Sequence, residues 1–337
     1  MNNKSDLATY KGKGWKERKT IGLEEFNKGI HWHSAGVNSE WNVLREVALY
    51  IPNANQQAPS SPNDFLHVAQ VSYDQLSKEV QALSDLYRSE GIKVHLVGDS
   101  PFGESILDYG SEHLHNLVFV PDLCINTPFG MIMARMGAEI RAGEEKYIAR
   151  CIGNIGIPTL YSIGGMGTFE GSDAMWLSPD SVIIGVGNRT NREGANQLVK
   201  VLNIHGVTCQ TVELPPTTQH LMGILRIVDE RRALVRNQIA PQKLIQILRE
   251  LDFEIISIDE SSCVSDHFAM NCVVLSKNRI VSPLSECSLN EFLSNKGIDV
   301  QCVEASNMIK AGGGVGCVTG IFRRDLIPFS NRKQDEQ

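Results

Sequence analysis

The chain has 337 residues, 42% of them hydrophobic, which is enough for a sizeable core and argues against an intrinsically disordered protein. Its formal net charge of -7 argues against a nucleic-acid-binding protein, because phosphate contacts need a basic face. The sequence shows no apolar stretch of membrane-spanning length and no secretory signal at its start, so we expect a cytoplasmic protein without a membrane partner.

The secondary-structure pattern repeats along the chain, and each unit consists of two short strands, a helix and a third strand. The first unit is the least regular, because the position of one of its strands stays open. Its other elements are a strand over 47–51, a helix over 73–90 and a strand over 93–97. The second unit is expected to have strands over 117–120, 131–134 and 159–162 and a helix over 144–155.

The third unit shows the pattern most clearly. Its helix, expected over 192–203, has its apolar residues at helical spacing and ends at His205 and Gly206. Its strands are expected over 174–177, 182–186 and 207–212. The fourth unit is expected to have strands over 225–228, 233–235 and 253–258 and a helix over 241–251. The fifth is expected to have strands over 271–275, 280–281 and 300–303 and a helix over 289–296.

Five such units predict an α/β fold that closes into a ring, a five-bladed propeller of ββαβ units with pseudo-fivefold symmetry. We expect one catalytic domain over 38–325, between an N-terminal extension (1–37) and a polar C-terminal tail (326–337). The alternation of helices and strands would also fit a doubly wound sheet. The short hairpins within each unit disfavour that alternative, because purely parallel sheets do not need them.

Three reactive residues lie in the junctions that follow the third strands of units two, three and five: Glu170, His220 and Cys317. Equivalent junctions of a ring lie at the same end of its axis, so these side chains are expected to converge. A thiol, an imidazole and a carboxylate are the parts of a nucleophilic site. Cys317 also follows a glycine-rich run, which leaves space and backbone N–H groups around the sulfur.

Other motifs have simpler interpretations. The eight cysteines (124, 151, 209, 263, 272, 287, 302 and 317) form no CxxC pair, which indicates reduced thiols and no structural zinc. The glycines at 312–314 lack the Lys-Ser/Thr that a phosphate-binding loop needs. His31 and His33 form an HxH pair, which we interpret as incidental because no further metal ligands accompany it. The basic segment 11–19 is expected to be a solvated arm that covers the site or a partner subunit.

The order of these residues resembles that of the guanidino-group-modifying superfamily, which includes arginine deiminases, dimethylarginine dimethylaminohydrolases and amidinotransferases. The resemblance runs from about residue 38 to about residue 319. It implies the fivefold α/β propeller known as the pentein fold. The segments that carry it are 39–47, 115–122, Arg141 with Glu144, 170–173 (Glu-Gly-Ser-Asp), 188–191, His220 with Leu221, and 313–317.

The resemblance also implies roles for individual residues. Cys317 would attack the guanidino carbon, His220 would protonate the departing nitrogen and then activate water, and Glu170 would hold the imidazole. Asp122 and Asn116 would hold the guanidinium. Arg141 and Arg189 would bind the carboxylate of an arginine-like substrate, and Asp173 would bind substrate or brace its loop. No cofactor or metal is expected, and a homodimer is left open.

The chain departs from the family pattern at two positions. Met222 stands where deiminases and amidinotransferases carry an aspartate, and Pro121 where dimethylaminohydrolases tend to have an acid. We expect a hydrolase that acts on arginine or a substituted arginine through a covalent Cys-amidino intermediate. An amidinotransferase, which would need an acceptor amine, is the alternative. A non-catalytic binding protein on the same fold would not need Glu170, His220 and Cys317, so their presence argues against it.

Overall fold

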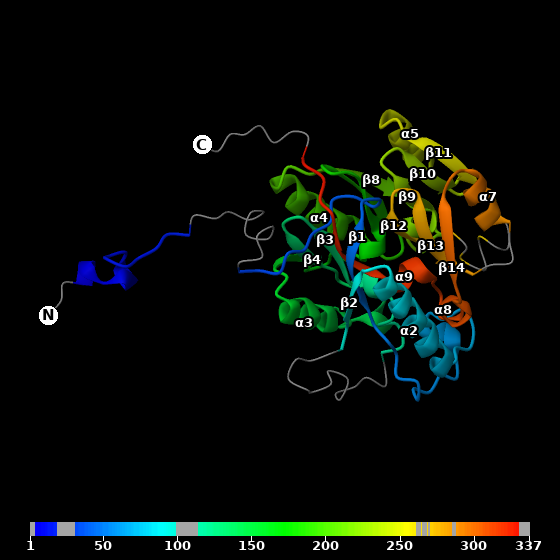
Figure 1. Ribbon diagram of the computed structural model, residues 1–337, viewed down its shortest axis with the longest axis horizontal. Coiled ribbons are helices and arrows are strands. Elements are labelled where there is room, and N and C mark those ends of the chain that lie inside the picture. The colour runs from blue at the N-terminus through cyan, green and yellow to red at the C-terminus, as the bar shows by residue number, and fades with distance from the viewer. Residues whose placement is uncertain are drawn as a thin grey trace.

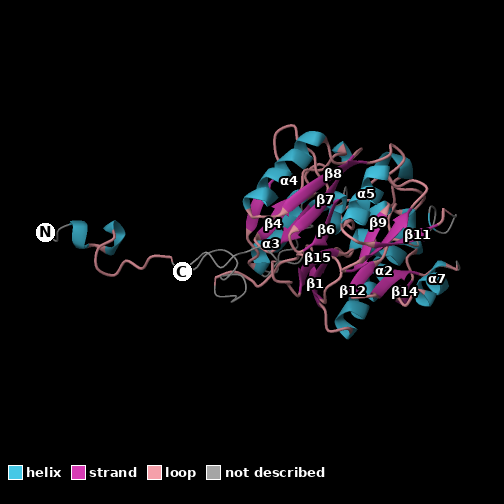
Figure 2. Cartoon of the chain, turned by 90° about the horizontal axis from the view of Figure 1, so that it is seen from above, coloured by secondary structure: helices cyan, strands magenta, loops and turns pink. Residues whose placement is uncertain are grey.

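The computed structural model describes residues 4–18, 31–98, 114–260, 264, 268, 270–284 and 288–329. Five three-stranded sheets form its body, with helices at the rim (Figures 1 and 2). Sheet one consists of β15 (Gly320–Arg324), β1 (Leu44–Leu49) and β2 (Lys93–Leu96), with α2 (Tyr73–Ser89). Sheet two consists of β3 (Cys124–Thr127), β4 (Gly130–Met133) and β5 (Thr159–Ser162), with α3 (Glu145–Ile155).

The other three sheets repeat the arrangement. Sheet three consists of β6 (Ala174–Ser178), β7 (Ser181–Val186) and β8 (Thr208–Glu213), with α4 (Arg192–Ile204). Sheet four consists of β9 (Leu225–Asp229), β10 (Arg232–Arg236) and β11 (Glu254–Ile258), with α5 (Gln242–Glu250). Sheet five consists of β12 (Val273–Ser276), β13 (Arg279–Pro283) and β14 (Asp299–Val303), with α7 (Leu289–Asn295).

The sheets close into a ring, as the repeat predicts. In every sheet the central strand pairs antiparallel with one neighbour and parallel with the other. Strand β1 packs against β12 of sheet five, β12 packs against β9 of sheet four, and β15 packs against β3 of sheet two. Sheets two, three and four join through the short turns that precede their first strands. The doubly wound alternative is therefore wrong.

The strand that the sequence leaves open in unit one comes from the far end of the chain. Strand β15 pairs antiparallel with β1, with Val47 opposite Ile321. The C-terminal strand thereby joins the N-terminal unit and closes the ring. A local pattern does not reveal this pairing, because the two strands are separated by most of the chain.

One predicted strand is wrong. Residues 117–120 form a buried turn, and the first strand of sheet two begins only at Cys124. The N–H of Phe119 donates to the carbonyl of Asn116, and the N–H of Asp122 donates to that of Phe119. Pro121 lies in the first turn of the 3-10 helix η6 (Val120–Leu123), where its missing N–H costs nothing. Burial of a turn and burial of a strand give the same short apolar run.

The third unit shows how the sequence sets an element. The side chain of Asn191 caps α4 by accepting the N–H of Gly194 at 2.8 Å. Ala195, Leu198 and Leu202 of the predicted apolar face are buried. The helix therefore covers the outer side of its sheet and leaves the strand ends free to approach the axis of the ring.

The segment 4–18 contains two short 3-10 turns, η1 (Lys4–Asp6) and η2 (Ala8–Tyr10), and lies apart from the ring in both views (Figures 1 and 2). Residue 19 of the predicted arm and residues 330–337 of the predicted tail lie outside the described residues. Six cysteines are described and all are free thiols, while Cys263 and Cys287 lie outside the described residues. Among the described helices, none combines the length and apolar character that crossing a bilayer requires.

Candidate active site

A short turn precedes the first strand of every sheet, and we call these the entrance turns. They are η6 (Val120–Leu123), η8 (Gly171–Asp173), η9 (Leu221–Gly223), the turn 270–272 and α9 (Val315–Val318). Turn η6 contacts both η8 and α9, and η8 contacts η9. Their polar side chains therefore gather at one end of the ring, although they are far apart in sequence.

A cavity of about 360 Å³ lies among the entrance turns. Three of the predicted site residues line it: Asp122, His220 and Cys317. Phe119, Met222, Ile239, Met270 and Asn271 also line it. The cavity thus combines the predicted nucleophile and imidazole with one carboxylate and a largely apolar wall.

Glu170 lies behind His220 and is fully buried. Its Oε2 is 2.7 Å from Nε2 of His220, and its Oε1 accepts the N–H of Gly137 at 3.0 Å. Nη1 of Arg189 lies 3.1 Å from Oε2. Burial alone would raise the pKa of Glu170, but the hydrogen bond from His220 and the charges of Arg141 and Arg189 hold it well below its usual range. Glu170 is therefore an anion that fixes Nε2 of the His220 ring.

His220 is held as a cation at neutral pH. Its burial alone would lower the imidazole pKa, but the charges of Asp122, Asp173 and Glu170 outweigh this and raise the pKa to about 9. Oδ1 of Asp122 is 3.9 Å from Nε2 of His220. The imidazolium can therefore donate a proton to a leaving group without first taking one from the solvent.

Asn271 holds Cys317 at two points. Its Nδ2 donates to Sγ at 3.0 Å, and its Oδ1 accepts the Cys317 N–H at 2.9 Å. Burial and the charge of Asp122 raise the pKa of the Cys317 thiol, while the hydrogen bond to the Gly314 backbone, the charge of Arg226 and the Asn271 hydrogen bond act in the opposite direction. The thiol is therefore neutral when the cavity holds no cation.

Sequence reasoning missed Asn271, placing it at the start of a strand that begins only at Val273. A signal was available. Asp122 precedes β3 by two residues, and Asn271 precedes β12 by two residues. Both occupy the same position in the repeat, so the comparison of units one against another would have found it.

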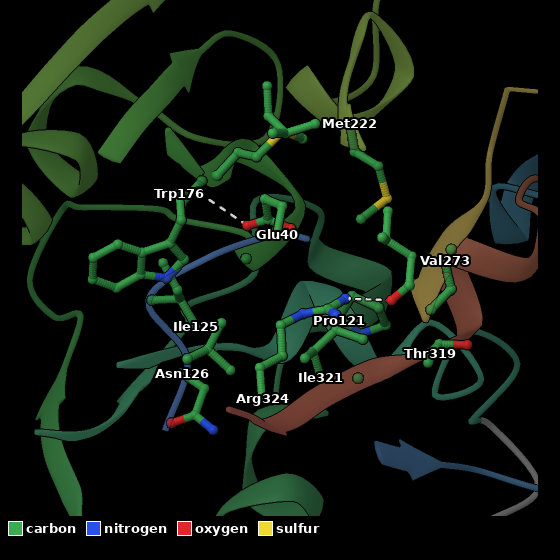
Figure 3. A pocket seen from close by; sticks show the side chains of 18 of the residues that line it. Glu40, Pro121, Ile125, Asn126, Trp176, Met222, Val273, Thr319, Ile321 and Arg324 are labelled. Atoms are coloured by element: carbon green, nitrogen blue, oxygen red, sulfur yellow. Dashed lines mark hydrogen bonds between the residues drawn. The ribbon is translucent and has the colours of Figure 1, made fainter. Parts of the chain in front are cut away.

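A second, smaller cavity of about 100 Å³ is lined by residues of β3, β6, β9, β12 and β15, one strand from each sheet (Figure 3). Met222 borders both cavities. Glu40 lines the smaller cavity and accepts the N–H of Trp176 at 3.0 Å, and burial raises the pKa of its carboxyl. Arg324 donates to the carbonyl of Val274, and burial lowers its pKa to about 10. Arg226 also lines this cavity, and its charge lowers the pKa of the Cys317 thiol.

Besides Glu170, four predicted residues do not line the cavity that holds Cys317: Arg141, Arg189, Asn116 and Asp173. Arg141, predicted to bind the substrate carboxylate, is buried against internal carboxylates instead. Its Nη1 is 2.5 Å from Oδ2 of Asp122, and its Nε is 2.9 Å from Oε2 of Glu144. Arg189 pairs with Glu170. Both guanidinium groups are thus occupied by internal carboxylates, a contact that a sequence pattern does not distinguish from substrate binding.

Asn116 and Asp173 have structural partners as well. Nδ2 of Asn116 donates to the Phe65 carbonyl at 3.0 Å. Asp173 accepts the Thr190 hydroxyl at 2.6 Å and the N–H of Leu221 at 2.9 Å. Burial raises the pKa of Asp173 to about 6. Asp173 therefore braces η8 against η9, the second of its two predicted roles.

Asp122, Glu170 and His220 also bring one potential metal-ligand atom each to within 4.8 Å of one another. Two guanidinium groups already form ion pairs with these carboxylates, Arg141 with Asp122 and Arg189 with Glu170. A divalent cation would meet both positive charges. The arrangement therefore suits proton transfer better than metal binding.

Comparison with known proteins agrees with this geometry. Residues 53–239 match the family described as arginine deiminase. The chain is 30% identical over 208 residues to the N(G),N(G)-dimethylarginine dimethylaminohydrolase of Pseudomonas aeruginosa, covering 62% of this chain and 77% of that protein. An uncharacterized protein of Bacillus subtilis is 25% identical over 85% of this chain and 94% of its own length.

Solved structures share the fold. A citrulline complex of the P. aeruginosa enzyme superposes with a TM-score of 0.66 at 23% identity, covering 82% of this chain and 98% of that one. The inosamine-phosphate amidinotransferase of Streptomyces griseus gives 0.63 at 14% identity over 88% and 98%. The fold and the set of relatives define a guanidino-group-modifying pentein. Within that superfamily, the chain belongs to the arginine deiminase family.

Proposed function

We propose that this protein is a cysteine-dependent hydrolase of N-alkylated, arginine-like guanidino compounds, of the dimethylargininase type. The observation that carries the proposal is the shared cavity of Cys317, His220 and Asp122, in which Met222 lies beside the thiol. Sγ of Cys317 is 3.9 Å from Sδ of Met222. The relationship to the P. aeruginosa dimethylaminohydrolase supports the same substrate class.

The apolar wall favours an alkylated guanidinium. An arginine guanidinium carries five N–H donors, each of which needs an acceptor when it is buried. Among the described residues that line the cavity, Asp122 is the one carboxylate, and Phe119, Met222 and Met270 present carbon and sulfur. N,N-dimethylation replaces two donors with methyl groups, which match these side chains.

Catalysis would begin with the charge of the substrate. A guanidinium bound beside Asp122 offsets the negative charge that raises the pKa of Cys317, so the thiol loses its proton to solvent. The thiolate attacks the guanidino carbon and forms a C–S bond. Protonated His220 then donates its proton to the alkylamine nitrogen, and the C–N bond breaks as the amine leaves.

Water completes the cycle. Neutral His220 accepts a proton from a water molecule whose oxygen attacks the same carbon, and the C–S bond breaks to return the Cys317 thiolate. The proton left on the attacking oxygen passes to solvent, so the product is a neutral ureido compound, and His220 is again protonated. Glu170 remains an anion throughout and stabilises the imidazolium through its 2.7 Å hydrogen bond.

The test is mass spectrometry of the products from N,N-dimethylarginine, N-methylarginine, arginine, agmatine and guanidinoacetate, each with and without glycine or ornithine. We expect a ureido product and an alkylamine from the methylated arginines without an acceptor, and none from the Cys317→Ala protein. A product that appears only with an acceptor amine would instead establish an amidinotransferase. Absence of turnover on the whole panel, or equal turnover by Cys317→Ala, would overturn the proposal.

A further inference from the structure

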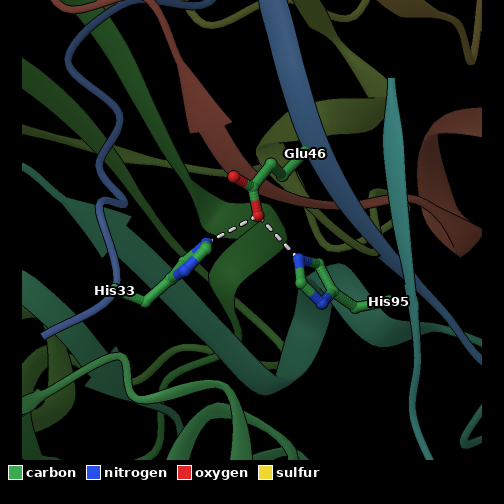
Figure 4. Close-up of side chains that lie close together, drawn as sticks. All are labelled: His33, Glu46 and His95. Carbon is green, nitrogen blue, oxygen red and sulfur yellow. Dashed lines mark hydrogen bonds and ion pairs between the residues drawn. The ribbon is translucent and has the colours of Figure 1, made fainter. Parts of the chain in front are cut away.

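His33, Glu46 and His95 form a compact cluster on sheet one, remote in sequence from the proposed catalytic residues (Figure 4). Glu46 belongs to β1 and His95 to the neighbouring β2, while His33 comes from the segment that leads into the ring. Nε2 of His33 is 2.8 Å from Oε2 of Glu46, and Nε2 of His95 is 2.6 Å from the same oxygen. None of the three lines the cavity that holds Cys317.

The ligand atoms converge as those of a metal site do. One nitrogen from each ring and one carboxylate oxygen all lie within 4.8 Å of one another, and both rings point at the carboxylate in Figure 4. Two imidazoles and a carboxylate suit zinc and neighbouring first-row ions. We propose that His33, Glu46 and His95 bind a divalent first-row transition metal ion, for which Zn²⁺ is the probe.

The surroundings of Glu46 fix its carboxylate for this role. Nε of Arg323 donates to Oε1 at 2.8 Å, so one oxygen is held while Oε2 faces the two imidazoles. An outer partner of this kind orients a ligand and is part of many metal sites. Nζ of Lys93 lies 3.9 Å from Oε2, but 57% of the Lys93 side chain is exposed, so its ammonium can turn toward solvent.

Binding needs a local side-chain movement. In a tetrahedral site with bonds of about 2.0–2.2 Å, the ligand atoms lie about 3.3–3.6 Å apart. The observed separations from Oε2 are 2.6 and 2.8 Å, so side-chain rotations that widen each by about 0.5–1 Å admit the ion. The His33 side chain is 25% exposed, which gives the ion a route from solvent and leaves a fourth position for water.

The ion would tie the N-terminal segment to the ring. Beyond His33, Gly36 forms a bridge with Arg323 of β15, so the segment lies along the edge of sheet one. A metal shared by His33 and the two strands cross-links it there, and metal binding becomes coupled to stability. The HxH pair gave no sign of this site, since Glu46 and His95 come from other parts of the chain.

The experiment uses the full-length Cys317→Ala protein, which removes the thiol as a competing ligand, after dialysis against a chelator. Calorimetric titration with ZnCl₂ should show one equivalent of zinc bound. A thermal unfolding scan with saturating zinc should show a Tm several degrees higher, of the order that ligand linkage predicts. His33→Gln and His95→Gln should each weaken the Kd at least about tenfold, the scale on which even supporting residues act. Absence of binding, or a Kd in His33→Gln and His95→Gln equal to that of the Cys317→Ala parent, would overturn the proposal.

Two controls separate ligation from damage to the fold. His205→Gln replaces a half-buried histidine that stacks on Phe129 and should leave the zinc affinity unchanged. Lys93→Ala removes the neighbouring ammonium and should tighten binding, a direction that misfolding would not produce. With Co²⁺ in the wild-type protein, weak visible bands without thiolate charge transfer support the imidazole–carboxylate site. A strong thiolate band alone would place the ion at a cysteine and overturn it.

Discussion

Replacing Glu170 with glutamine should lower the pKa of His220 and shift the pH range of activity. The substitution keeps the shape of the side chain and removes a negative charge 2.7 Å from Nε2. Asp122, Asp173 and Glu170 together raise the pKa of His220 from 6.5 to about 9 against its burial. That difference corresponds to about 3 kcal/mol. If the three carboxylates share this free energy, Glu170 contributes about 1 kcal/mol or more. The pKa of His220 should therefore fall by about one unit in Glu170→Gln.

The sign of the stability effect follows from the direction of the shift. The pKa of His220 is higher in the folded protein than in the unfolded chain. Its contribution to stability is therefore fully present below pH 6.5 and is lost as the pH rises through about 9. Urea unfolding at pH 6 and pH 9.5 should show this loss in the wild type and a smaller loss in Glu170→Gln.

The main assay is the pH profile of kcat/KM. Deprotonation of His220 removes the acid that serves the leaving group, so the alkaline limb should move about one unit lower in Glu170→Gln. Glu144→Gln is the matched control, because Glu144 also pairs with Arg141 and is buried but is not among the groups that perturb His220. An alkaline limb that stays in place in Glu170→Gln, or that moves equally in Glu144→Gln, would refute the reasoning.

Three further substitutions test the site. Met222→Asp should raise the ratio of kcat/KM for arginine to that for dimethylarginine by about tenfold or more, since a charged hydrogen bond contributes about 1.5–3 kcal/mol. Asn271→Ala should reduce kcat about tenfold or more and slow alkylation of the nucleophile, because Sγ loses its 3.0 Å donor. Gly316→Ala should destabilise the fold by about 1–3 kcal/mol in urea unfolding, since a Cβ there would overlap Nη2 of Arg226. Gly153→Ala, where a Cβ meets no atom within 4 Å, is its control and should not destabilise.

The fold was largely predictable because its repeat is local. Each hairpin, helix and following strand leaves its own periodicity, and α4 was located to within one residue. The failures concern what a short window does not contain. Residues 117–120 are as apolar as a strand because the turn is buried, and β15 joins β1 across the whole chain.

The candidate site was predictable in its reactive groups and not in its supporting ones. Cys317 and His220 stand in equivalent junctions, so the ring brings them to one cavity. An arginine offers the same five donors to a substrate carboxylate and to a buried glutamate. Only tertiary contacts reveal that Arg141 serves Asp122 and Arg189 serves Glu170.

Met222 joins the specificity of the site to its thiol chemistry. It borders both the larger cavity, which holds Cys317, and the smaller cavity, which holds Arg226. An aspartate there would add a second negative charge beside a thiol whose pKa Asp122 already raises, and it would give Arg226 an anion to neutralise. With methionine, the charge of Arg226 acts on Cys317 instead and lowers its pKa. Met222→Asp should therefore gain arginine turnover while slowing alkylation of the free enzyme by iodoacetamide at neutral pH. Faster alkylation would show that the charge at position 222 does not control the thiol.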